Sequence, residues 1–183
     1  ITTEAELETA VARLRGEPLV AVDTEAAGYH RYFDRVCLLQ LSTRTDTLVI
    51  DTLSLARLDG LLPILADPAI EVVFHDADYD IRLLQRDFGL TVRGVFDTKI
   101  AAQFLGEQAF GLASLVEKYL GRKLTKAFQR ADWARRPLPP EMLEYAAEDT
   151  EYLPALRDGL REALEEAGRM RWAEEEFRLE ESI

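Results

Sequence analysis

The chain has 183 residues, of which 48% are apolar and 31% charged, the composition of an ordinary globular protein of one domain. Lysine and arginine number 22 and aspartate and glutamate 34, which gives a formal net charge of −12. An acidic chain binds nucleic acid poorly unless it has a local basic patch or bound cations that reverse the local charge. A single cysteine, Cys37, excludes an internal disulfide and a cysteine-rich zinc site.

No apolar run is long enough to span a membrane, and no signal peptide is visible. We therefore expect a cytoplasmic protein that makes no membrane contact.

The first half of the chain predicts strands interleaved with helices. An amphipathic helix over residues 3–14, capped by Thr2 or Thr3, precedes a strand over 18–25 and two strands, 35–42 and 46–51, that favour an antiparallel meander. A helix is predicted over 55–65, a strand over 70–75, a helix over 76–89 with Asp76 as N-cap, and a short strand over 92–98. From Thr98 onward the pattern is mostly helical.

This order of elements predicts an α/β fold, with a mixed five-stranded sheet flanked by helices. Residues 1–160 are expected to form the main domain. Residues 161–183 are expected to form an acidic helical extension that packs on this domain or trails from it. Its apolar contacts are expected from Leu164, Trp172 and Phe177.

The stretch "LVAVDTE" carries two acids at the end of a predicted central strand. Alternate strand residues share a face, so Asp23 and Glu25 lie on one side about 7 Å apart, while Thr24 lies on the other. The strand could simply have reached solvent there. In "HDADYDIRLL", Asp80 falls at the edge of the apolar helix face, where a half-hydrated flank position is the simpler explanation.

Asp149 is harder to explain as a surface residue. If residues 142–160 form one helix, Asp149 lies in the middle of its apolar stripe, and Tyr145 faces the same way one turn earlier. A buried carboxylate without a partner is costly, so an ion pair with an arginine is one explanation. Tyr145 alone would read as a core aromatic.

The acids make more sense together. Four converging carboxylates would repel one another, and two divalent cations would balance their charge. Oxygen ligands favour Mg²⁺ or Mn²⁺, and a carboxylate-held metal pair is suited to in-line displacement at phosphorus. Tyr145 would orient or help deprotonate the attacking water.

A local basic stretch occurs in "GRKLTKAFQRADWARRPL". Residues 122–136 carry six basic side chains against Asp132 alone. They are either a solvated loop or a clamp for the backbone of a single strand. Trp133 is expected to pack and not to stack on bases. The loop aromatics Tyr29, Tyr32 and Phe33 could stack on bases, but loop packing is the simpler interpretation.

The stretches "VAVDTE", "VFHDADYDIRLLQRDFG" and "YAAEDTEYL" resemble the three exonuclease motifs of the DEDD superfamily, and the tyrosine before the last aspartate resembles its DEDDy branch. "FDTKIAAQFLG" and "KAFQRADWARRPLP" are similar to ribonuclease D and its exosome relatives. The resemblance covers residues 3–160 and implies a ribonuclease-H-like fold with 3′→5′ exoribonuclease activity that releases nucleoside 5′-monophosphates from single-stranded 3′ ends.

The resemblance also implies roles for individual residues. The metal ligands would be Asp23, Glu25, Asp80 and Asp149, and Tyr145 would complete the catalytic set by positioning the attacking water. Substrate contacts are expected from Thr24, His75, Lys126, Gln129 and Arg130, with RNA favoured over DNA.

Three alternatives stay open: a DNA exonuclease of the same chemistry, an inactive domain that binds nucleic acid or a partner, and a metal-dependent phosphatase of small molecules. The helical nucleic-acid-binding domains of longer ribonuclease D proteins have no counterpart within these residues, so a catalytic fragment and a stand-alone enzyme are both possible.

Overall fold

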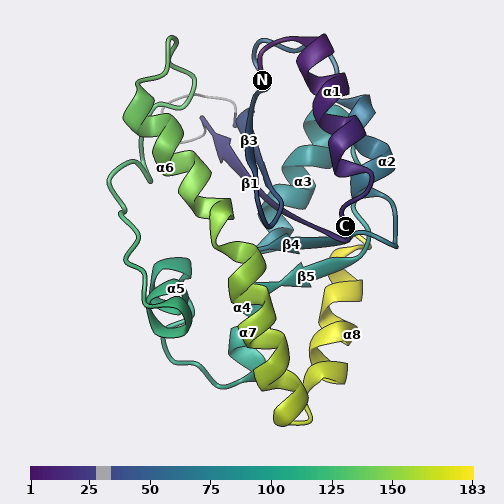
Figure 1. Cartoon of the computed structure of the whole chain (residues 1–183), viewed down its shortest axis with the longest axis vertical. Helices are drawn as coiled ribbons and strands as arrows, with labels where there is room; N and C mark the ends of the chain where they lie inside the picture. Colours follow the sequence, from purple (N-terminus) through teal and green to yellow (C-terminus); the bar gives the residue numbers. More distant parts are fainter. Residues whose placement is uncertain (28–33) are drawn as a thin grey trace.

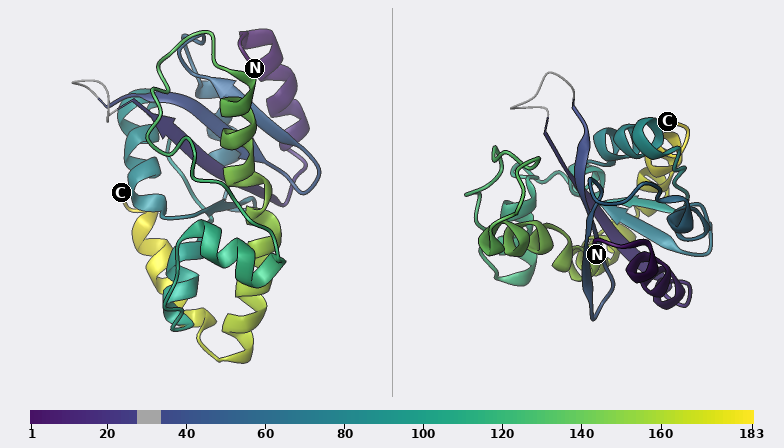
Figure 2. Two further views of the ribbon diagram at one scale, coloured as in Figure 1. Left: turned by 90° about the vertical axis from the view of Figure 1, so that its left-hand side faces the viewer. Right: turned by 90° about the horizontal axis from the view of Figure 1, so that it is seen from above.

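The computed structural model describes residues 1–27 and 34–183 as a mixed five-stranded sheet with helices packed on both faces (Figures 1 and 2). The strand order is β3-β2-β1-β4-β5, with β1 in the centre. The predicted α/β architecture is confirmed. Among the described residues, no helix combines the length and the apolarity that crossing a membrane requires.

The sheet joins an antiparallel meander to a parallel pair. Strand β1 (Leu19–Ala26) runs antiparallel to β2 (Val36–Ser42), which pairs antiparallel with β3 (Thr47–Asp51). On its other side β1 is parallel to β4 (Glu71–Phe74), and β4 is parallel to β5 (Val95–Asp97). Parallel strands end at the same edge, so the residues after β4 and β5 lie near the end of β1.

The N-terminal helices begin as the sequence indicates, with one exception. Helix α1 (Glu4–Leu14) has Thr3 as N-cap: its hydroxyl accepts from the N–H of Glu6, and the carboxylate of Glu6 accepts from the N–H of Thr3, which completes a capping box. The predicted helix over 55–65 is shorter than expected: only a 3₁₀ turn, η1 (Asp59–Leu61), and one turn of α2 (Leu62–Leu65) form there.

Asp97, at the end of β5, anchors the starts of two helices. Its buried carboxylate accepts hydrogen bonds from the backbone N–H groups of Asp76 and Ala77, where α3 (Ala77–Phe88) begins, and from those of Lys99 and Ile100 in α4 (Thr98–Phe104). Asp76 is the N-cap residue of α3, as predicted, but its side chain makes no cap bond and pairs with Lys99 instead. The carboxylate of Asp97 accepts from the first N–H groups of the helix in its place.

The C-terminal half contains α5 (Leu112–Leu120), α6 (Pro140–Glu151), α7 (Leu153–Glu166) and α8 (Met170–Glu180). Helix α6 lies across β1, β2 and β3 (Figure 1). The single helix predicted over 142–160 is divided at Tyr152, where α6 ends and α7 begins. Pro154 stands in the first turn of α7, where its missing N–H costs no helical bond.

The acidic tail packs on the sheet edge. Phe177 is buried against Phe96 at a ring distance of 4.9 Å, and the side chain of Glu181 accepts a hydrogen bond from the N–H of Val95 on the edge strand. Leu164 is buried as expected, whereas Trp172 is 55% exposed and its apolar contact stays a prediction. The domain boundary at residue 160 stays a prediction, and α7 runs across it.

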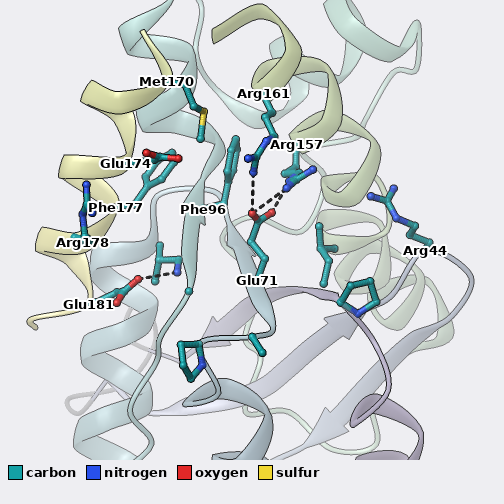
Figure 3. Close-up of a pocket in the computed structure, with 16 residues that line it drawn as sticks. Arg44, Glu71, Phe96, Arg157, Arg161, Met170, Glu174, Phe177, Arg178 and Glu181 are labelled. Atoms are coloured by element: carbon teal, nitrogen blue, oxygen red, sulfur yellow. Dashed lines mark hydrogen bonds and ion pairs between the residues drawn. The ribbon is translucent and has the colours of Figure 1, made fainter. Parts of the chain in front are cut away.

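A cleft lies at the amino ends of the parallel strands. It has a volume of about 660 Å³ and is lined by Arg44, Glu71, Arg157 and Arg161, among others (Figure 3). Arg157 and Arg161 both bind Glu71, and Arg44 pairs with Asp158. Arg161 also pairs with Glu165, so three of the protein's own acids balance the positive charge of these three arginines.

Glu180 makes the stability of this packing dependent on pH. Burial, together with the negative charge of Asp97, raises the pKa of Glu180 from 4.5 to about 9. The folded chain therefore keeps a proton that the unfolded chain releases, and the free energy of unfolding falls as pH rises across this interval.

Glu180→Gln should remove that loss, so the variant should become progressively more stable than wild type between about pH 5 and 9 in urea unfolding. Glu176→Gln, at an exposed position of α8, is the control. Parallel pH profiles for Glu180→Gln and wild type would contradict this account.

Candidate active site

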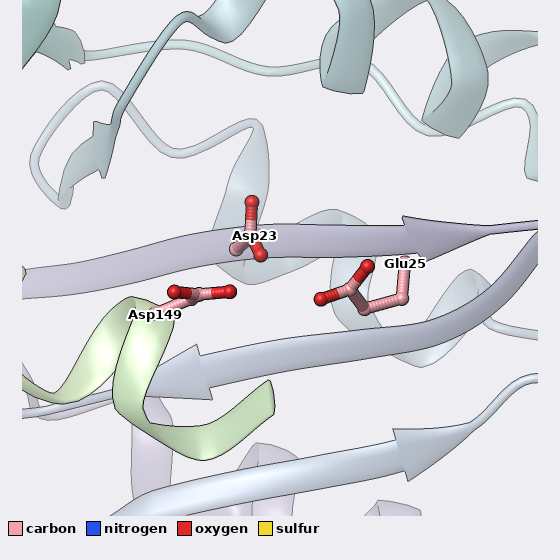
Figure 4. A group of neighbouring side chains, drawn as sticks. All are labelled: Asp23, Glu25 and Asp149. Atoms are coloured by element: carbon pink, nitrogen blue, oxygen red, sulfur yellow. The ribbon is translucent and has the colours of Figure 1, made fainter. Parts of the chain in front are cut away.

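Three carboxylates from distant parts of the chain meet beside the end of the central strand. Each of Asp23, Glu25 and Asp149 offers an oxygen within 4.8 Å of the others. Figure 4 shows Asp23 and Glu25 on β1 and Asp149 on α6, with their side chains turned toward one another. The convergence expected for these three acids is therefore present in the fold.

The local sequence explains why these acids lie together. The first four residues of β1 are fully buried and the last four only partly, so the strand leaves the core at Asp23. Strand alternation keeps Asp23 and Glu25 on the face covered by α6. Helix α6 is held there by Thr150, whose hydroxyl accepts a hydrogen bond of 2.7 Å from Ser42 on β2.

The electrostatics of this cluster oppose ionisation of all three acids. Burial, followed by the charges of Asp23 and Asp149, raises the pKa of Glu25 to about 10. Burial and the charge of Asp23 raise the pKa of Asp149 to about 8, and burial also raises that of Asp23. Among residues 1–27 and 34–183, no lysine or arginine pairs with any of the three. An arginine partner for Asp149, one of the explanations drawn from the sequence, is therefore not found there.

Asp80 lies next to this cluster but not within it. It is buried at the start of α3, and its Oδ1 accepts a hydrogen bond from the hydroxyl of Thr24. Burial raises the pKa of Asp80 to about 7, although the bond from Thr24 opposes this shift. The charge of Asp80 in turn raises the pKa of Asp23, so the two are electrostatically coupled. The roles of Asp80 as a metal ligand and of Thr24 in substrate binding stay predictions.

Tyr145 is held rigidly beside the acids. Its ring stacks on Trp133 at 6.0 Å and meets the edge of Phe128 at 5.7 Å. Burial and the nearby charges of Asp149 and Glu25 raise the pKa of its phenol, so the hydroxyl stays protonated near neutral pH. Trp133 is 1% exposed, which agrees with the expectation that it packs and does not stack on bases.

A cleft of about 320 Å³ opens beside the acids, at the carboxyl ends of the parallel strands. Its walls include Asp23, Asp149 and Tyr145 together with three of the residues expected to contact substrate: His75, Lys126 and Gln129. Arg130 does not line it, and its predicted contact stays a prediction. The loop aromatics Tyr29, Tyr32 and Phe33 lie outside the described residues.

Several residues near the acids were not predicted. Gln40 lies opposite Asp23 on β2, fully buried, with its Nε2 3.5 Å from Asp23 Oδ2. The first turn of α5 also lines the cleft, through Leu112, Ala113 and Ser114. The pairing of β1 with β2 could have located Gln40, whereas no motif marks the approach of α5.

The basic stretch over 122–136 divides into two parts. Lys126 is exposed in the cleft, but Arg136 is not available as part of a clamp. Arg136 binds Asp51 with two hydrogen bonds of 2.9 and 2.7 Å and also donates to the carbonyl of Cys37. It fixes the loop before α6 to the meander, so Arg136 lends no support to the clamp, which is one of the two interpretations of this stretch.

Comparisons with known proteins agree with this geometry. Residues 1–165 match the 3′-5′ exonuclease family, and the chain belongs to that family. It is 45% identical to exosome complex component 10 of Rattus norvegicus over 157 residues, which are 85% of this chain and 18% of that protein. It is 38% identical to ribonuclease D of Granulibacter bethesdensis over 181 residues, which are 97% of this chain and 45% of that protein. The chain therefore spans less than half the length of both curated relatives.

Solved structures show the same fold. The catalytic core of RRP6 from Trypanosoma brucei has a TM-score of 0.93 at 38% identity, over 99% of this chain and 50% of that one. Escherichia coli RNase D, described as an exoribonuclease involved in structured RNA processing, has a TM-score of 0.93 at 34% identity, over 100% of this chain and 49% of that one. Brucella melitensis NrnC with bound Mg²⁺ has a TM-score of 0.83 at 31% identity, over 92% and 84%.

The residues present suit a divalent cation. Carboxylate oxygens are hard ligands of the kind that Mg²⁺ and Mn²⁺ prefer, and three of them converge here without a described basic partner. A bound cation would relieve the repulsion that raises the pKa values of these acids. The acidic cluster is therefore a candidate metal site, with Asp23, Glu25 and Asp149 as ligands.

Asp149→Asn removes one of the mutually repelling carboxylates without changing the size of the side chain. In EDTA at about pH 8, the free energy of unfolding of this variant should exceed that of wild type by about 1 kcal/mol or more. Mg²⁺ should then stabilise wild type and leave the variant nearly unchanged, because binding to the folded state alone raises stability. Thermal unfolding with and without Mg²⁺ measures both effects.

The control is Glu144→Gln, at an exposed position of α6. If Mg²⁺ stabilised Asp149→Asn as strongly as wild type, Asp149 would not be a ligand.

Proposed function

We propose that this chain is a metal-dependent 3′→5′ exoribonuclease domain of the ribonuclease D type, which releases nucleoside 5′-monophosphates from single-stranded RNA. The observation that carries the proposal is the placement of the acidic cluster at the wall of a cleft that also presents Lys126 and Gln129. Membership of the 3′-5′ exonuclease family and the exoribonuclease description of the E. coli relative support it.

In this proposal the acids and the cleft have separate tasks. Asp23, Glu25 and Asp149, with Asp80 beside them, would hold two cations, Mg²⁺ or Mn²⁺; bound there, the cations would supply an activated water and stabilise negative charge on the phosphate. Lys126 attracts the backbone phosphate of the entering strand, which an otherwise acidic surface would repel. Leu112 and Leu153 add apolar surface to the wall of this cleft.

Tyr145 acts in this scheme by position. Because burial and neighbouring carboxylates raise the pKa of its phenol, the hydroxyl is a hydrogen-bond donor near neutral pH and not a base. Packing against Trp133 and Phe128 fixes the ring, so the hydroxyl is held ready to orient the attacking water or a phosphate oxygen. Of the two roles expected for Tyr145, orientation is the one that these observations favour.

RNA is the proposed substrate. The proposed location and the absence of membrane contact follow from the sequence alone. The RNA preference draws on the similarity to E. coli RNase D, an exoribonuclease. A cytoplasmic location and the absence of membrane contact stay predictions, as does the identity of the RNA.

Asp149→Ala should abolish exonuclease activity while leaving the chain folded. We expect wild type to shorten a 5′-labelled single-stranded RNA stepwise from its 3′ end in Mg²⁺ or Mn²⁺, and to stop in EDTA. The variant should be at least about 10³-fold slower because the cation site loses a ligand. Circular dichroism confirms folding, and Glu144→Ala on the exposed side of α6 is the matched control.

Matched substrates separate the alternatives. Equal rates on RNA and DNA of one sequence would favour an exonuclease without sugar preference. Hydrolysis of mononucleotides at the rate of oligonucleotides, without sensitivity to salt, would favour a small-molecule phosphatase. Full activity of Asp149→Ala, or no metal-dependent shortening by wild type, would contradict the proposal.

A further inference from the structure

Within residues 1–27 and 34–183, the ring of His75 is hydrogen-bonded to the protein through one nitrogen. Its Nδ1 lies 2.9 Å from the hydroxyl oxygen of Thr98, at the start of α4. That hydroxyl lies 3.0 Å from the carbonyl oxygen of Phe74, the last residue of β4. The imidazole also lines the cleft beside Asp23 and Asp149. Its second nitrogen, Nε2, is the one left for a ligand in that cleft.

The order of donors in this chain of hydrogen bonds fixes the tautomer of His75. A carbonyl oxygen only accepts, so the single hydroxyl hydrogen of Thr98 must be donated to Phe74. The hydroxyl can then only accept from His75, which places the ring proton on Nδ1. In the neutral imidazole, Nε2 therefore carries a lone pair and no hydrogen.

The surroundings keep the ring neutral near physiological pH. Burial lowers the pKa of His75, and the charge of Lys99 acts in the same direction, while Asp97 and Asp76 oppose the shift. Asp97 accepts hydrogen bonds from four backbone N–H groups, and Asp76 pairs with Lys99. Both acids are thus engaged elsewhere in the fold.

The chemistry of the cleft limits what this nitrogen can recognise. A phosphate has no hydrogen to donate near neutral pH, and its attraction to the cleft comes from Lys126. An unprotonated Nε2 needs a donor, and the hydroxyls of the sugar are the donors that every ribonucleotide carries next to its reacting phosphate. His75 is thus suited to the sugar of the terminal nucleotide.

On the basis of the proposed exonuclease function, we propose that His75 Nε2 accepts a hydrogen bond from a ribose hydroxyl of the 3′-terminal nucleotide, with Thr98 as the positioning residue that sets the tautomer. If the donor is the 2′-OH, this contact makes the enzyme select RNA; if it is the 3′-OH, the contact selects a free 3′ end.

The tautomer is tested without catalysis. The chain has two histidines, so a sample labelled with ¹⁵N at histidine shows only two imidazoles, and His30→Gln assigns them. We expect the His75 spectrum to show a protonated Nδ1 and an unprotonated Nε2. In Thr98→Val, which keeps the side-chain shape but removes the hydroxyl, the spectrum should shift toward a mixture of tautomers. Protonation at Nε2 in wild type would overturn the inference.

The contact itself is tested with three RNA oligonucleotides that end in uridine and differ only in the last sugar: ribose, 2′-deoxyribose or 3′-deoxyribose. Wild type should be slower by about tenfold, the worth of one hydrogen bond, on the oligonucleotide that lacks the contacted hydroxyl. His75→Leu should lose this discrimination. His75→Gln, which can place an acceptor oxygen near the Nε2 position, should keep part of it.

The two proposals fail in different ways. If wild type shortens none of the oligonucleotides, the proposed function itself is wrong. If wild type is active but His75→Leu slows all three substrates by the same factor, His75 does not read the sugar. His75 also does not recognise the sugar if wild type degrades all three oligonucleotides at one rate.

Discussion

Carboxylates that repel one another are crowded together at the end of the central strand, and the rest of the site is arranged around that repulsion. Asp23, Glu25 and Asp149 lie within one small, half-buried volume, with no basic partner in the described part of the chain. Placing such groups together lowers stability unless protons or cations compensate. A fold with many exposed positions for acids gains nothing structural from this arrangement, so a bound cation is its simplest cause.

The scaffold explains how a short chain brings these acids together. The carboxyl ends of β1, β4 and β5 meet at one edge. Asp23 and Glu25 lie in the last half of β1, His75 follows β4, and Thr98 follows β5. Asp97 secures this edge by capping α3 and α4 at once, which also fixes the hydrogen-bond partner of His75. The meander supplies the other wall, because α6 rests on it and carries Tyr145 and Asp149 into place.

The sequence predicted those parts of the site that depend on local periodicity. Alternation along β1 put Asp23 and Glu25 on one face, and helical spacing put Asp149 on the inner side of α6. Contacts made by segments that carry no motif were missed. Examples are the contact of Gln40 with Asp23 and the position of α5 at the wall of the cleft. Charge counting also failed for Arg136, because a sequence does not show that Asp51 lies within bonding distance. The break at Tyr152 was missed although Pro154 marked it, because proline in a first turn and proline within a helix look alike in a periodic pattern.

The central claim is that a divalent cation is shared by acids from β1 and α6. Anomalous diffraction from crystals grown with Mn²⁺ tests it most directly. The account predicts a peak within about 2–2.5 Å of carboxylate oxygens from Asp23, Glu25 and Asp149. An empty cluster at saturating Mn²⁺, or a guanidinium in place of the ion, would contradict it.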